Sequence, residues 1–147
     1  FVIYNKKYKS KNIDSLSSSV DIFPTLLDAL DISFPGIKLD GNNKIKSTKS
    51  KNYIISEHAH RGPCSLNLSK GIAYISFRTK DYKYIKKLKP NERDFNKKIM
   101  EILVDVNNDK NEIMNLVNDK KYLEILTYFR QQYLYRIKEL NLLKYLD

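Results

Sequence analysis

The residues best suited to chemistry lie close together in one short segment. Both histidines of the sequence fall there, beside a carboxylate, an arginine and the single cysteine, in the order Glu57, His58, His60, Arg61 and Cys64. The planar fork of an arginine can hold an anionic group, and a histidine can donate a hydrogen bond near neutral pH. Glu57 and Arg61 could equally join two parts of a loop as structural residues. We take Glu57, His58, His60 and Arg61 as candidates for substrate binding.

Two further chemistries for this segment lack a necessary partner. His58 and His60 could supply two metal ligands, but no third ligand follows at a defined spacing. Cys64 near a histidine has the residue types of a thiol nucleophile pair, but nearness along a loop does not establish a hydrogen bond between them. A single cysteine also excludes an intrachain disulfide framework. The segment therefore predicts neither a metal site nor a catalytic residue.

A second group of oxygen-bearing side chains lies at residues 105–109, where Asp and Asn alternate as at the start of a calcium loop. A helix-loop-helix calcium site needs Gly where Lys110 stands and a bidentate Glu where Leu116 stands. We instead predict a turn in which Asp and Asn side chains bond their own backbone. A helical turn with Glu112 near its start is expected to follow.

The elements that position these residues can be predicted from residue periodicity. Four short runs of β-branched and aromatic residues predict strands, over residues 53–56, 71–79, 82–88 and 101–106. The candidate segment, residues 57–69, should follow the first strand as an irregular loop. Short strands joined by tight links favour an antiparallel sheet. Apolar residues at intervals of three and four over residues 120–147 predict a long amphipathic helix that covers one face of that sheet.

The beginning of the chain predicts a separate strand and helix. Residues 1–4 resemble a strand, and because the chain starts inside it we expect a longer parent protein. Residues 21–30 predict a helix that is capped by one of three serines, has Pro24 in its first turn and packs on a sheet. A polar stretch follows, and we place a boundary near Lys49. Residues 1–48 should be only marginally stable alone, since one strand and one helix bury little surface.

The composition restricts the possible partners. The formal net charge is +10, and lysines supply most of the positive charge. The lysines are spread along the chain, whereas phosphate and base recognition favours arginine forks and clustered basic faces, so we do not expect nucleic-acid binding. No stretch approaches the roughly twenty apolar residues that a membrane helix needs.

Four segments, in order, resemble motifs of the sulfatase family. Residues 20–27 resemble a signature that lies downstream of the catalytic residues, Pro35-Gly36 with Asp40-Gly41 resembles a P-G-x-x-x-D-G turn, and Arg78-Thr79 with Tyr82-Lys83-Tyr84-Ile85 resembles an R-T-x-x-Y-K-Y-I hairpin. The fourth segment resembles L-Y-D-L-x-x-D-P-x-E-x-x-N-L, with identity at Leu103, Asp105, Asp109, Glu112, Asn115 and Leu116. Val104 and Lys110 depart from it, where the pattern has Tyr and Pro.

The resemblance implies a fold of the alkaline phosphatase superfamily. That fold is an α/β sandwich followed by a smaller C-terminal subdomain, which has α+β character with a four-stranded antiparallel sheet and a packed long helix. Residues 1–48 would be the last strand and helix of the catalytic α/β domain, and residues 49–147 the C-terminal subdomain. The chain would then be a C-terminal fragment that lacks the catalytic N-terminal portion.

The resemblance also implies cofactors for the intact parent. They are a calcium ion and a formylglycine nucleophile, which is made from Cys or Ser in a C/S-x-P-S-R motif. No residue here can take these roles, because Cys64 is followed by Ser65-Leu66-Asn67 and the upstream acidic ligands have no counterpart. We therefore expect no catalytic residue, metal or cofactor in this chain.

The expected function is that of the C-terminal part of a sulfuric ester hydrolase, with a sulfate ester as the substrate of the intact parent. The chain would contribute scaffold and, through the segment at Glu57 to Cys64, contacts that select the substrate. One alternative is a phosphodiester or phosphonate monoester hydrolase of the same superfamily, since the missing nucleophile decides the chemistry. The other alternative is a freestanding basic module that binds nucleic acid or another polyanion.

Overall fold

The computed structural model describes residues 2–47, 51–60, 72–88 and 100–141. The chain divides into two compact units, Phe1–Ile54 and Ile55–Asp147. This division falls a few residues beyond the boundary that the sequence placed near Lys49. The assignment of the first region to a catalytic domain stays a prediction.

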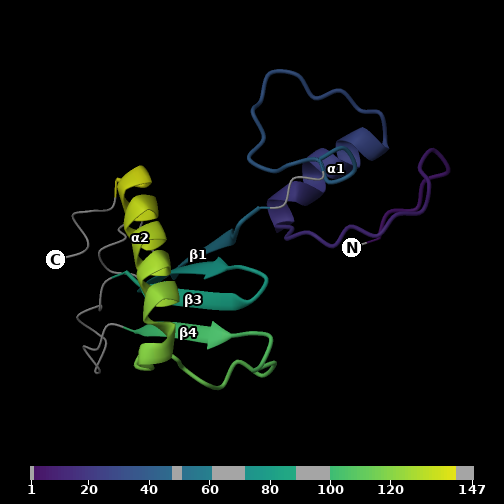
Figure 1. Ribbon diagram of the computed structural model, residues 1–147. Helices are drawn as coiled ribbons and strands as arrows, with labels where there is room; N and C mark the ends of the chain where they lie inside the picture. The colour runs from purple at the N-terminus through teal and green to yellow at the C-terminus, as the bar shows by residue number, and fades with distance from the viewer. Residues whose placement is uncertain (1, 48–50, 61–71, 89–99, 142–147) are drawn as a thin grey trace. The chain divides into compact units, whose positions relative to one another are not determined.

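The first unit is built around one helix. A short 3-10 turn, η1 (Ser19–Asp21), leads into α1 (Ile22–Ala29), as the sequence predicted (Figure 1). Pro24 lies in the first turn of α1, where a missing N–H costs no helical hydrogen bond. The helix ends at Ala29, Leu30 is its C-cap, and Asp31 adopts a left-handed φ of 54°. The predicted strand at residues 1–4 is wrong for residues 2–4, which pair with no strand among the described residues.

Asp21 joins the start of α1 to the loop that follows it. Its fully buried carboxylate accepts hydrogen bonds from the backbone N–H of Ser18 at 2.9 Å and of Asn42 at 2.8 Å, and from Lys51 Nζ at 2.9 Å. One turn later, Thr25 Oγ1 accepts the backbone N–H of Lys44 at 3.0 Å. Burial alone would raise the pKa of Asp21, but the three hydrogen bonds outweigh it and the pKa lies below its usual value.

Gly41 allows this loop to approach the helix start. A Cβ atom at residue 41 would lie 1.8 Å from the carbonyl oxygen of Val20 and 2.9 Å from Cα of Asp21. No side chain fits at that distance from backbone atoms, so the contact requires glycine. The first two segments that resemble sulfatase motifs, residues 20–27 and 35–41, therefore pack against each other.

The second unit contains a four-stranded antiparallel sheet in the order β1-β2-β3-β4. Its strands are β1 (Ile54–His60), β2 (Ile72–Arg78), β3 (Tyr82–Lys87) and β4 (Glu101–Asp105). The predicted sheet is therefore confirmed. The hairpin between β2 and β3 is closed by Thr79, whose Oγ1 accepts the backbone N–H of Tyr82 at 2.9 Å.

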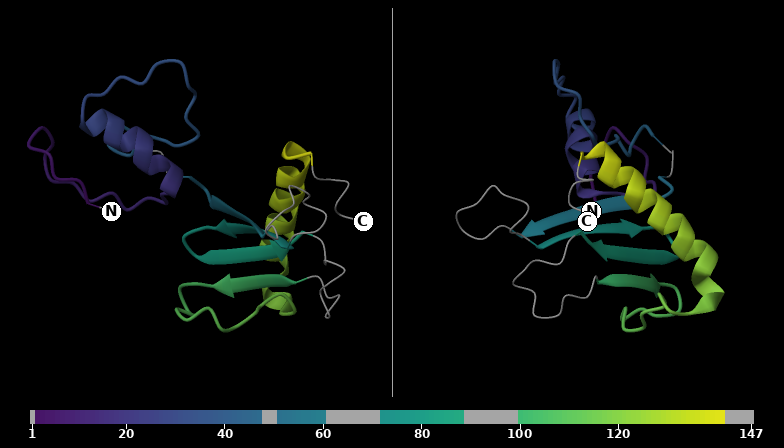
Figure 2. Two further views of the ribbon diagram at one scale, coloured as in Figure 1. Left: turned by 180° about the vertical axis from the view of Figure 1, so that it is seen from behind. Right: turned by 90° about the vertical axis from the view of Figure 1, so that its left-hand side faces the viewer.

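One face of this sheet is covered by the long helix α2 (Leu123–Glu139), which follows the 3-10 turn η3 (Lys120–Tyr122) (Figures 1 and 2). Phe77, Tyr84 and Leu103 occupy matching positions on three adjacent strands, and all are fully buried. Phe129 of α2 stacks on Tyr84 with ring centroids 5.4 Å apart. The predicted amphipathic helix is confirmed as far as Glu139, and residues 142–147 lie outside the described part. No described helix is long and apolar enough to cross a membrane.

Candidate functional site

The candidate segment begins inside a strand rather than in a loop. The sequence ended the first strand of the sheet at Ser56, but β1 continues to His60. Glu57, His58 and His60 are therefore strand residues, and the prediction of an irregular segment from residue 57 is wrong over residues 57–60. Arg61 and Cys64 lie outside the described residues.

Glu57 holds β1 to the covering helix. Its carboxylate accepts a hydrogen bond from Arg136 Nε of α2 at 2.6 Å, and Arg136 also contacts Glu139 at 3.1 Å. The hydrogen bond from Glu57 keeps the pKa of Arg136 above its usual value. Glu57 thus has a structural role, in which its partner lies 79 residues away along the chain. No local spacing in the sequence could indicate this contact.

His58 lies next to Glu57, and its side chain is exposed. Consecutive strand residues point to opposite faces of a sheet. Because Glu57 reaches α2, His58 points to the face away from α2. His60 is the last residue of β1. Among the four candidates the structure describes the side chains of Glu57 and His58, which point to opposite faces of the sheet. The role of all four in substrate binding stays a prediction.

A metal ion has no candidate ligand set in the described part of the chain. No group of three or more His, Cys, Asp or Glu side chains lies close enough there to hold one. The calcium and the formylglycine that the resemblance implies for the intact parent stay a prediction.

The segment after β4 forms the predicted side-chain turn. Asp105 Oδ1 accepts the backbone N–H of Asn107 and of Asn108, each at 3.1 Å, and Asn108 Nδ2 donates to Asp105 Oδ2 at 2.8 Å. The hydrogen bonds from Asn108 keep the pKa of Asp105 below its usual value. The helical turn expected at Glu112 is wrong, because that residue has a left-handed φ of 55° and no helix follows before residue 120.

Glu112 instead reaches back to the β2–β3 hairpin. Its carboxylate contacts Arg78 at 3.2 Å and also pairs with Lys83. Arg78 and Lys83 are partners in the strand register, so both cations lie on one face of the sheet. The third and fourth segments that resemble sulfatase motifs therefore bind each other.

Asn115 takes the place of a neighbouring strand beside β4. Its Oδ1 accepts the backbone N–H of Leu103 at 3.1 Å, and its Nδ2 donates to the carbonyl of Glu101 at 3.0 Å. The backbone N–H of Leu116 donates to the carbonyl of Leu103 at 2.8 Å. These bonds satisfy backbone groups on the edge of the sheet.

We expect Asn115→Ala to lower the free energy of unfolding by about 1 kcal/mol, because two hydrogen bonds to edge backbone groups are lost. Asn111→Ala, at an exposed position in the same loop, is the matched control. Urea unfolding followed by circular dichroism measures both. Equal midpoints for the two variants would show that Asn115 does not hold the edge.

A polar network joins the sheet to α2, and the sequence did not predict it. Arg130 binds Glu101 with two hydrogen bonds, from Nε at 2.9 Å and from Nη2 at 2.7 Å. Tyr84 donates its hydroxyl to Glu101 at 2.5 Å. The Arg130 hydrogen bond is the main cause that lowers the pKa of Glu101 to about 2. Burial and the bond to Glu101 raise the pKa of Tyr84 well above its usual value.

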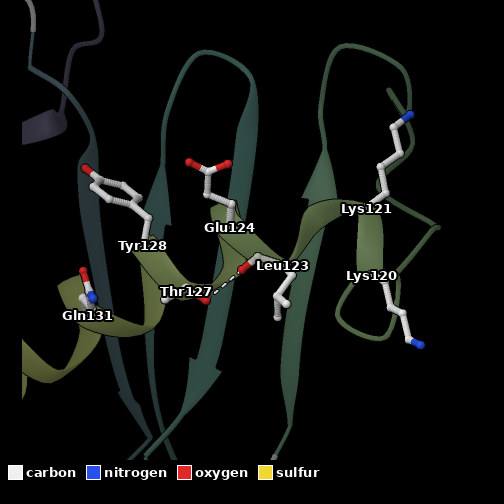
Figure 3. A pocket seen from close by; sticks show the side chains of 7 residues that line it. All are labelled: Lys120, Lys121, Leu123, Glu124, Thr127, Tyr128 and Gln131. Atoms are coloured by element: carbon white, nitrogen blue, oxygen red, sulfur yellow. Dashed lines mark hydrogen bonds between the residues drawn. The ribbon is translucent and has the colours of Figure 1, made fainter.

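A pocket lies at the N-terminal end of α2 (Figure 3). Its lining residues all come from one stretch of chain, namely Lys120, Lys121, Leu123, Glu124, Thr127, Tyr128 and Gln131. A pocket lined by one stretch of helix has a single wall and cannot enclose a substrate. It does not include any residue that the sequence proposed for binding.

No protein-family model matches the chain, and no curated protein matches it either. Among solved structures, a 2-O GAG sulfatase is 28% identical, with a TM-score of 0.57 over 81% of this chain and 24% of its own. A protein of Bacteroides thetaiotaomicron VPI-5482 that is classed as a sulfatase is 27% identical, with a TM-score of 0.61 over the same shares.

A third solved structure carries a different chemistry on the same fold. The phosphonate monoester hydrolase of Agrobacterium radiobacter is 20% identical, with a TM-score of 0.61 over 83% of this chain and 25% of its own. The chain thus spans about a quarter of the length of the structures that it matches. These likenesses confirm the resemblance to sulfatases and to the fold of the alkaline phosphatase superfamily.

Proposed function

We propose that the chain is the C-terminal part of a sulfatase-like hydrolase of sulfuric esters. We call the longer protein the parent enzyme. One observation carries the proposal. Residues that resemble sulfatase motifs make the contacts that hold separate segments together in both units, in a fold shared with sulfatases. In this role the chain supplies scaffold, and the nucleophile that breaks the ester belongs to the rest of the parent enzyme.

We also propose that calcium and formylglycine belong to the part of the parent enzyme outside this chain. Formylglycine would supply the nucleophile that attacks a sulfate ester. The described residues hold no cluster of metal ligands, and Cys64 has no C/S-x-P-S-R context. Chelation of divalent cations should therefore inactivate the parent enzyme but leave the circular dichroism of the 147-residue chain unchanged.

The test of this function compares the parent enzyme with the chain alone. We expect the parent enzyme to release para-nitrophenol from para-nitrophenyl sulfate, and the 147-residue chain to release none. Hydrolysis by the chain alone would contradict the scaffold role. An inert parent enzyme that is folded and carries the nucleophile motif would contradict the sulfatase proposal.

A phosphonate monoester hydrolase is the second candidate, because one solved neighbour has that activity on the same fold. Its likeness is lower in identity than that of the two sulfatases. Turnover of a phosphonate monoester and a sulfate ester with the same leaving group separates the two candidates.

We propose that His58, His60 and Arg61 contact the substrate in the parent enzyme, because His58 is exposed on the sheet face away from α2 and the other two follow it. Replacing each of the three with Ala should lower kcat/KM of the parent enzyme by about tenfold, equal to about 1.4 kcal/mol of transition-state binding. Glu57→Ala is the contrast, since loss of its bond to Arg136 should lower stability and leave kcat/KM unchanged. Unchanged turnover and specificity in all three variants would refute the contact.

A further inference from the structure

Helix α2 has a second side, which is turned away from the sheet. The stripe of α2 that faces the strands is buried and consists of Leu126, Phe129, Tyr133 and Ile137. On the opposite side three large side chains are exposed, Tyr128 by 39%, Leu134 by 47% and Tyr135 by 61%. Residues three, four and seven apart share one side of a helix. The exposed residues of this side, which we call the outer face of α2, are Glu124, Thr127, Tyr128, Gln131, Leu134, Tyr135 and Lys138.

The two halves of the outer face differ in shape. The pocket at the N-terminal end of α2 opens on the first half, between Glu124 and Gln131 (Figure 3). Thr127 in this half donates its hydroxyl to the carbonyl of Leu123 at 2.8 Å, so it needs no polar partner from outside. The second half carries Leu134 and Tyr135, and exposed tyrosines are enriched in protein interfaces. The side chains of one half could therefore fill the pocket of the other half in a second molecule.

The charges of the outer face are complementary to themselves when two copies of α2 lie antiparallel. Glu124 precedes Gln131 by seven residues, and Lys138 follows it by seven. A two-fold axis beside Gln131 brings positions at equal distances in opposite directions together, so each Glu124 meets Lys138 of the second copy. A parallel pair would instead place like charges against each other.

The uncharged residues of the outer face fit the same arrangement. Tyr128 and Tyr135 lie on one flank of Gln131, three residues before it and four after it, and Thr127 and Leu134 lie on the other flank. The two-fold axis pairs each flank with itself. Two rings then meet on one flank and two aliphatic groups on the other, as at the seam of an antiparallel helix pair.

We propose that the outer face of α2 is the interface of a symmetric antiparallel dimer with a second copy of this chain. The proposal goes beyond the proposed function and does not depend on it. Opposite charges at equal distances from Gln131 favour a second copy, because an unrelated partner would not require that symmetry. A pair of 17-residue helices buries less than the roughly 1,600 Å² of a standard interface, so we expect a dissociation constant of about 10 to 100 µM.

Crosslinking on the two-fold axis tests the arrangement directly. Gln131→Cys is introduced with Cys64→Ser into the 147-residue chain, and formation of the disulfide-linked dimer under mild oxidation is followed by non-reducing gel electrophoresis. Because the two thiols would meet on the axis, we expect crosslinking at least about tenfold faster than for Asn111→Cys with Cys64→Ser. Asn111 is exposed in a loop and measures random collision. Equal rates for the two variants would contradict the dimer.

Exchange of the two charges is the second test, with sedimentation equilibrium as the measurement. Glu124→Lys and Lys138→Glu should each weaken the dimer by about tenfold, because two attractive pairs become repulsive. The double variant restores opposite charges and should return the dissociation constant to within about twofold of wild type. Both positions are exposed, and circular dichroism checks that the fold is kept. Weakening by the single variants without recovery in the double variant would refute the antiparallel pairing.

Three other outcomes overturn the proposal. A chain that stays monomeric at millimolar concentration does not use the outer face for a second copy. A dimer that Leu134→Asp leaves unchanged is formed by another surface. Slow maleimide labelling of Gln131→Cys that does not depend on protein concentration would show that another part of the same chain covers the outer face.

Discussion

Replacing Glu101 with Gln is expected to lower the free energy of unfolding of the second unit by about 3 kcal/mol at pH 7 and by less than about 1 kcal/mol at pH 2. The pKa of Glu101 in the folded protein is about 2, against a usual value of 4.5. The side chain of Glu101 is 14% exposed and that of Arg130 is 42% exposed, so solvent screens the two bonds between them in part.

The way this stability changes with pH follows from the direction of the pKa shift of Glu101. A carboxylate whose folded pKa is lowered contributes stability that is fully present above the unfolded pKa of 4.5 and is lost as the pH falls through about 2. Gln removes the charge, and therefore the pH-dependent contribution, while keeping the shape. Urea unfolding at pH 7, 4 and 2, followed by helical circular dichroism, measures the difference.

Glu124→Gln is the matched control, because Glu124 is an exposed carboxylate on α2, the helix that carries Arg130. Its effect should stay within about 0.5 kcal/mol at every pH. A difference between wild type and Glu101→Gln that is the same at pH 7 and pH 2 would show that the charge of Glu101 does not stabilise the fold.

Replacing Gly41 with Ala is expected to separate the loop at residues 40–44 from α1, at a cost of about 3 kcal/mol or more. The added Cβ would lie 1.8 Å from a backbone oxygen and 2.4 Å from a backbone carbon of Val20, and backbone atoms cannot rotate away as a flexible side chain can. Movement of the loop would also leave the buried carboxylate of Asp21 without its bond from Asn42.

Hydrogen exchange of the Asn42 and Lys44 amides measures this effect, since both donate to side chains of the helix start. Gly41→Ala should abolish their protection in the parent enzyme. Asp40→Ala, at the exposed neighbouring position, should leave it unchanged. Intact protection in Gly41→Ala would contradict the close approach.

Most elements of the fold could be predicted because their signals are local. The periodicity of residues 21–30 and 120–139 and the alternation within β2 and β3 depend on neighbours in sequence. The extent of β1 was missed for a physical reason: β1 is an edge strand, and its exposed Ser56, Glu57 and His58 carry the polar composition of a loop.

The contacts that stabilise the fold could not be predicted, because they join residues far apart in sequence. Glu101 and Arg130 are 29 residues apart, and Glu57 and Arg136 are 79 apart. The apolar stripe of α1 was visible in the sequence. Its exposure was not, because periodicity shows that a helix has an apolar side but not which side the rest of the unit covers.

The motif residues show a related limit. The resemblance located Asp21, Gly41, Glu112 and Asn115, and the structure shows that each holds backbone or charged groups of another segment. These residues therefore stabilise the fold. The four candidates for substrate binding rested on residue type alone, and one of them, Glu57, is already bonded to α2.

The most direct test of the sulfatase proposal is the ratio of kcat/KM for two substrates of the parent enzyme, para-nitrophenyl sulfate and a para-nitrophenyl phosphonate monoester. With a common leaving group, the ratio reports whether the active site stabilises the transition state of sulfuryl transfer or that of phosphonyl transfer. We predict that the sulfate ester is favoured by about a hundredfold or more, equal to about 2.7 kcal/mol. Faster turnover of the phosphonate monoester would contradict the proposal and assign the parent enzyme to the phosphonate hydrolases.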